Sequence, residues 1–98
     1  MSDLELKEQI LEIIENAIQE LKEEGLSPDI LLAGPQFAQN ASEVLDVVGL
    51  SVYVISELEY DAVVADSRYL GQIRRASKRI SIEPLMVEEN LWEEIREL

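Results

Sequence analysis

The sequence predicts an α+β fold: a single small domain, residues 1–98, with a four-stranded mixed sheet, a long N-terminal helix, a crossover helix and a short C-terminal helix. A chain of 98 residues has room for one domain. Its hydrophobic content of 47% is sufficient for a core. Short apolar runs, typical of strands, alternate with stretches of helical periodicity in the order α, β, α, β, β, β, α.

The first helix is predicted from a capping box and a long amphipathic pattern. Ser2 and Glu5 have the spacing of a capping box, and Gly25 ends the helical periodicity. The other face is rich in glutamate, which is typical of a solvated helix surface. The apolar face consists of Ile10, Ile13, Ile14, Ala17, Ile18 and Leu21.

The next three elements form a predicted βαβ unit. Residues 29–33 are a short apolar run between turn residues, which is typical of a buried strand. Gly34 and Pro35 open a second helix, and Gly49 ends it. Residues 52–55 are expected to form a second buried strand. Two strands joined through a helix should lie parallel, with a right-handed crossover.

The last part of the chain predicts two more strands and a helix. Residues 62–65 form an apolar third strand, and residues 79–83 alternate as a half-buried fourth strand that Pro84 ends. The C-terminal helix is recognised by apolar residues at helical spacing, with glutamates on its other side. These apolar residues are Leu91, Trp92, Ile95 and Leu98.

The charge and the cysteine content restrict the partners and the location. The net charge of −13 repels nucleic acid and anionic membranes, so neither is expected as a partner. The absence of cysteine rules out disulfides and thiolate metal sites and suits a reducing cytosol. The N-terminus has acids where a signal peptide begins with positive charge, and the longest apolar run is too short to span a membrane. We therefore expect a soluble, cytoplasmic protein.

The residue types argue against an enzyme. Without histidine or cysteine, the chain lacks the commonest general base, reactive nucleophile and transition-metal ligands. Its serines lie in no nucleophile-elbow pattern. The LLAGPQ turn joins a strand to a helix N-terminus, but it has a single glycine, and Pro35 offers no N–H to a phosphate. We predict no catalytic residue, no cofactor and no metal site.

One acidic segment leaves two alternatives open. Glu57, Glu59 and Asp61 alternate, so in an extended segment all three would project on one side and could hold a hard cation through oxygen. As a calcium loop beginning at Glu57, the segment has Ala62 where glycine is needed and Arg68 where a bidentate glutamate is needed. The favoured alternative is a solvated acidic loop.

Five of the eight basic residues lie within one 12-residue span, which is the main candidate for an interaction site. They can pair with acids of their own chain, with acidic faces of neighbouring subunits or, least favoured, with nucleic acid. Trp92 is interpreted as a core residue, with a docking helix as the alternative. The candidates for a subunit interface are Arg68, Arg74, Arg75, Lys78, Arg79 and Trp92.

The stretch DAVVADSRYLGQIRRASKRISIEPL, residues 61–85, resembles the axial domain of encapsulin shell proteins and of tailed-phage major capsid proteins. In that lineage an apolar strand ending in an acid precedes an arginine-rich segment and an alternating strand. The preceding elements correspond to SPDILLAGPQF and ASEVLDVVGLSVYVIS, so the resemblance covers about residues 5–85. The length is similar to that of the A-domain, or family 4, encapsulins, which consist of the axial domain alone.

This resemblance implies a capsid axial-domain-like fold and a function. The chain is expected to be a non-enzymatic, self-associating structural protein, a minimal encapsulin shell component that associates with or encloses an enzyme cargo in a nanocompartment. Its partners would be further copies of itself and that enzyme. The alternative from a different class is a small acidic adaptor that binds a single protein partner through its C-terminal helix.

Overall fold

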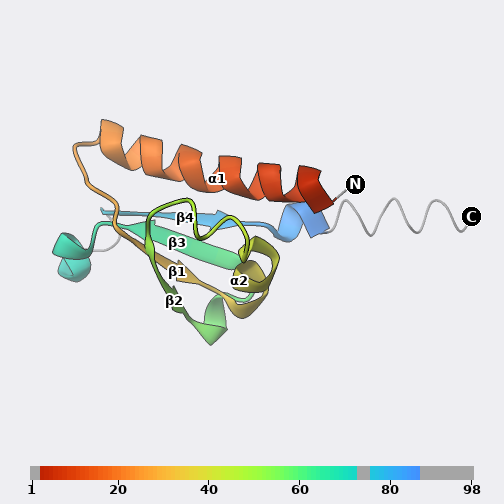
Figure 1. Ribbon diagram of the computed structural model, residues 1–98. Coiled ribbons are helices and arrows are strands. Elements are labelled where there is room, and N and C mark those ends of the chain that lie inside the picture. The colour runs from red at the N-terminus through yellow and green to blue at the C-terminus, as the bar shows by residue number, and fades with distance from the viewer. Residues whose placement is uncertain (1–2, 73–75, 87–98) are drawn as a thin grey trace, which may run out of the picture.

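The computed structural model describes residues 3–72 and 76–86, and it has the α+β architecture that the sequence predicts (Figure 1). Residues 83–86 are also helical. The elements in chain order are α1 (Asp3–Glu23), β1 (Ile30–Ala33), α2 (Pro35–Ala41), β2 (Ser51–Val54), η1 (Ser56–Leu58), β3 (Asp61–Ala65), η2 (Ser67–Gln72) and β4 (Ser77–Ser81).

The four strands form one mixed sheet in the order β2-β1-β3-β4. β1 and β2 are parallel, with Leu31 opposite Val52, as expected for a βαβ unit. On the other side of β1, β3 runs antiparallel, with Leu31 opposite Val64. β4 then pairs antiparallel with β3. This arrangement leaves β2 and β4 as the two edges of the sheet.

The core lies between the helices and one face of the sheet. α1 runs along that face above β4 in Figure 1, and it contacts α2 as well as β3 and β4, so both helices cover the same face. Their apolar side chains interdigitate with those of the central strands. The core includes Ile10, Ile14, Ala17, Leu21, Leu31, Ala33, Phe37, Ala41, Val44, Ala62, Val64 and Ile82.

The crossover helix is shorter than predicted. α2 ends at Ala41, and residues 42–48 form turns rather than continuing the helix to Gly49. The valines and aspartate of this stretch have low helix propensity, which favours the tighter turns. Val44 is nevertheless buried, because a chain of turns with bonds such as Val47 N–H to Val44 C=O keeps a period close to that of a helix.

The expectation that the second strand is buried is wrong. β2 lies at an edge, and the exposed fractions of Tyr53 and Val54 are 55% and 60%. An apolar run predicts a strand but does not give its position in the sheet. The chain continues from β2 past β1 and forms β3 on the far side of it, so β2 is left with one neighbour.

Two further boundaries complete the comparison with the predictions. β4 spans Ser77–Ser81, two residues earlier than predicted, and Pro84 lies in the first turn of the helical segment that follows, where proline is tolerated. The predicted C-terminal helix, Trp92 included, lies outside the described residues. None of the helices in residues 3–72 and 76–86 is long and apolar enough to cross a membrane.

Phe37 provides a test of the core. Its side chain is fully buried among residues from α1 and the sheet, so Phe37→Ala should reduce the free energy of unfolding by about 3–5 kcal/mol, as measured by denaturant titration. The control is Val47→Ala, at a side chain that is 69% exposed, which should change stability by less than about 0.5 kcal/mol. Equal losses in the two variants would contradict this account of the core.

Candidate subunit interface

The structure describes half of the candidate interface residues. Arg68, Lys78 and Arg79 lie within residues 3–72 and 76–86, whereas Arg74, Arg75 and Trp92 lie outside the described residues. Each of the three described side chains forms an ion pair with a carboxylate of its own chain. Intramolecular pairing, one of the alternatives from the sequence, therefore describes these three contacts. They differ in how firmly the partner is held.

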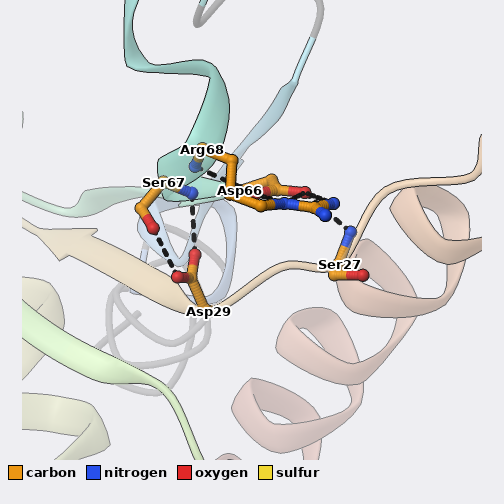
Figure 2. Close-up of polar contacts among 5 residues, drawn as sticks. All are labelled: Ser27, Asp29, Asp66, Ser67 and Arg68. Atoms are coloured by element: carbon orange, nitrogen blue, oxygen red, sulfur yellow. Dashed lines mark hydrogen bonds and ion pairs between the residues drawn. The ribbon is translucent and has the colours of Figure 1, made fainter.

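Arg68 is bound to a carboxylate that is almost completely buried (Figure 2). Asp66 follows β3 and is 1% exposed. Its oxygens accept hydrogen bonds from the backbone N–H of Ser27 at 2.9 Å and of Arg68 at 3.0 Å. The Arg68 guanidinium adds Nε at 3.0 Å and Nη2 at 2.6 Å. The guanidinium contact, aided by the two backbone donors and opposed by burial, holds the pKa of Asp66 well below its usual range.

Asp29 forms a second contact of the same kind beside the first. It precedes β1, and its carboxylate accepts the backbone N–H of Ser67 at 2.7 Å and the Ser67 hydroxyl (Figure 2). These hydrogen bonds from Ser67 lower the pKa of Asp29. The Asp29 backbone also bridges strands, because its N–H donates to Ala65 and its C=O accepts from Ser51. Together the two carboxylates fix the start of η2 against the loop that leaves α1.

The sequence analysis did not identify Asp29, Asp66 or Ser27 as part of the site. A signal was present for Asp66, because an acid that directly follows an apolar strand can accept the N–H two residues later as an Asx-turn, here that of Arg68. Ser27 contributes only its backbone N–H, so no side-chain pattern could have indicated it.

Lys78 and Arg79 make looser contacts on opposite faces of β4. Lys78 Nζ lies 2.9 Å from Glu20 of α1, and both side chains are about half exposed. Arg79 reaches Asp61 on β3, with Nε at 2.9 Å and Nη2 at 2.6 Å from the same carboxylate oxygen. Hydrogen bonds from Ser81 and then from Arg79 lower the pKa of Asp61. Exposed pairs of this kind contribute roughly 0–1 kcal/mol each, so they can exchange partners at little cost.

The geometry required for a cation at Glu57, Glu59 and Asp61 is absent. Glu57 lies in the short helix η1, and the backbone of Glu59 has a positive φ of 51°, so the segment is not extended. Asp61 is engaged by Arg79. Within residues 3–72 and 76–86, no group of three or more such ligands could hold a metal ion. Glu57 and Glu59 are exposed, whereas Asp61 belongs to β3 and is partly buried.

The helix N-terminus after the LLAGPQ turn is already occupied by backbone groups. The Phe37 N–H donates to the Glu59 C=O at 3.1 Å, and the Gly34 N–H donates to the Asp61 C=O at 2.9 Å. Pro35 has no N–H. A Cβ at Gly34 would collide with the Glu59 backbone, which explains why glycine is needed here. The N–H groups of Gly34 and Phe37 are therefore not available to a phosphate.

Comparisons with known proteins assign the chain to a family. The family model described as "Putative type 4B encapsulin shell protein" matches residues 5–84. The chain belongs to this encapsulin family. A protein of Pyrococcus furiosus with the same description is 52% identical over 97 residues, which are 99% of this chain and 94% of the relative. The encapsulin resemblance read from residues 61–85 is confirmed, and the match covers almost all the described residues of this encapsulin-family chain.

The anchoring role of Asp66 predicts a specific pH dependence. Asp66→Asn should lower the melting temperature at pH 7, because the amide cannot form a charged pair with Arg68. A lowered folded-state pKa stabilises the protein above the unfolded pKa of about 4, and this contribution is lost as the pH falls. The difference in melting temperature between wild type and variant should therefore shrink between pH 7 and pH 3.

The matched control for this experiment is Asp46→Asn, which makes the same change at an exposed aspartate in the crossover turns. It should have little effect at either pH. A deficit for Asp66→Asn that is equally large at pH 7 and pH 3 would show that the charge of Asp66 does not stabilise the fold.

Proposed function

We propose that this protein is a non-enzymatic, self-associating subunit of an encapsulin shell that associates with or encloses an enzyme cargo in the cytoplasm. Membership of the encapsulin shell family supports the structural role. The cargo rests on the resemblance alone. The assembly mechanism depends on a single observation: Lys78 and Arg79 of β4 are exposed and only loosely paired with acids of their own chain, so acids of a neighbouring α1 can replace those partners.

The outward face of α1 is strongly acidic. Its exposed glutamates keep free copies apart by like-charge repulsion, and they offer an anionic surface to a basic neighbour. Lys7 and Lys22 are the basic residues of this helix, and Lys7 is already paired with Glu43. The exposed acids of α1 include Glu8, Glu12, Glu15, Glu20 and Glu23.

Lys78 and Arg79 supply the positive partner surface. Their side chains are 51% and 62% exposed, although each has a partner in its own chain. Because such exposed pairs contribute little, a neighbouring α1 can compete for these cations. Arg68 differs, since the buried Asp66 would lose its charged partner. A head-to-tail contact of β4 on one copy with α1 of the next is a heterologous interface, which forms rings when its rotation closes.

The test is to neutralise the two loosely held cations together. Lys78→Gln with Arg79→Gln should leave the fold intact and reduce assemblies to small particles, as measured by light scattering and electron microscopy at low and moderate salt. The matched control is Lys7→Gln with Lys22→Gln, which makes the same change of charge on α1 and should not reduce assembly, because it makes the proposed anionic surface more negative. A wild-type protein that is monomeric at high concentration in both salts would refute the proposal.

The enzyme cargo needs a separate measurement. An enzyme that sediments with wild-type assemblies, and not with the dispersed Lys78→Gln/Arg79→Gln variant, is the expected result when assemblies are isolated from their native cell. Assemblies that carry no enzyme would contradict the cargo while leaving the structural role in place.

A further inference from the structure

Among residues 3–72 and 76–86, no strand lies beside the outer side of β2. β2 lies at the edge of the sheet beside β1. The N–H of Ser51 donates to Asp29, and the N–H of Ile55 donates to Ala33. In a parallel pair, alternate residues bond to the neighbouring strand. The N–H and C=O groups of Val52 and Val54, at the intervening positions, therefore point away from β1 along the open edge.

The side chains on this edge are apolar and exposed. Tyr53 is 55% exposed and Val54 is 60% exposed. Natural proteins protect free strand edges with charged residues, because an apolar edge is a template for another strand. The opposite edge has this protection, since Lys78 and Arg79 of β4 are both exposed. The two edges differ in this respect, and β2 is the unprotected one.

Charge identifies which partner fits this edge. Two copies of a chain with a net charge of −13 can meet face to face only where like charges do not oppose each other. β2 has the sequence SVYV, which contains no Asp, Glu, Lys or Arg. A surface of this kind is self-complementary, which is the requirement for a contact around a twofold axis.

We propose that β2 pairs antiparallel with β2 of a second copy, around a twofold axis that passes midway between the two Tyr53 residues. In this register Val52 of one copy exchanges both backbone hydrogen bonds with Val54 of the other. The two Tyr53 side chains then face each other as a pair without mutual backbone bonds, where Cα atoms approach to about 4.5 Å. Tyr53 lies in the same row of the sheet as Leu32 and Val63, so the paired sheets share a continuous apolar strip.

This contact rests on the proposed self-association of the chain. It uses a different surface from the charged contact. A four-residue strand buries less than the roughly 1,000 Å² of a stable interface. Strand pairing alone therefore gives a weak dimer that depends on concentration. Combined with a head-to-tail contact, it joins rings to each other rather than subunits within a ring.

Crosslinking tests the register directly, because the chain contains no cysteine. Tyr53→Cys should give a disulfide-linked dimer on mild oxidation of the native protein, since the facing Cα atoms lie within the range of about 4.4–6.8 Å that a disulfide needs. The control is Val47→Cys, an exposed position outside the strand, which should crosslink at least tenfold more slowly. Equal crosslinking rates in the two variants would overturn the inference.

Two further variants block the pairing. Tyr53→Lys places like charges opposite each other, and Val54→Pro removes an N–H that points away from β1 and so leaves the sheet intact. Both should lower the dimer fraction at least tenfold at fixed concentration, as measured by analytical ultracentrifugation. Val47→Lys, with the same added charge, should not. An undiminished dimer in Tyr53→Lys would overturn the pairing.

The outcomes separate the two proposals. If the wild type assembles but the Tyr53→Cys variant does not crosslink, the strand pairing is overturned and the shell proposal stands. The same conclusion follows if the edge binds another protein instead. Crosslinked dimers that form no larger assembly support the strand pairing and contradict the shell proposal. A monomer under all conditions contradicts both.

Discussion

The end of the fold that carries the basic segment depends on a buried negative charge. A carboxylate removed from water is tolerated only when its oxygens are hydrogen-bonded and its charge is paired. Asp66 meets this requirement with donors from two separate segments, the loop after α1 and the start of η2. The carboxylate therefore determines where the chain turns after β3, and it holds the Arg68 guanidinium in an ion pair within the same chain. This is why the cluster of basic residues is not uniform, although it looks so in the sequence.

Much of the fold follows from patterns that are local. The periodicity of α1 and the strand-helix-strand unit predicted the long helix, the parallel β1–β2 pair and the apolar residues of the core. The edge position of β2 could not be predicted, because the pairing of β3 with β1 is a long-range choice that the SVYV run does not encode. The anchoring of Arg68 was missed for a similar reason, since one of the donors to Asp66 is the backbone N–H of Ser27, which lies 39 residues away in the sequence.

The charged and the uncharged parts of the surface affect contacts between copies in different ways. An excess of glutamate on α1 opposes random contact between copies, and it does so at a range set by the ionic strength. Short-range contacts then form only where opposite charges meet or where charge is absent. The β4 edge carries exposed cations and β2 carries no charged residue, so the two proposed contacts differ in kind, the first electrostatic and the second apolar.

α1 and α2 cover the same face of the sheet, and the row of Tyr53, Leu32 and Val63 lies on the reverse face. A chain of this size already buries a smaller share of its surface than larger domains do. Any molecule that settles on that reverse face binds the native form and not the unfolded one, so it raises the temperature at which the chain melts. Pairing through β2 in the proposed register would therefore make the melting temperature rise with protein concentration.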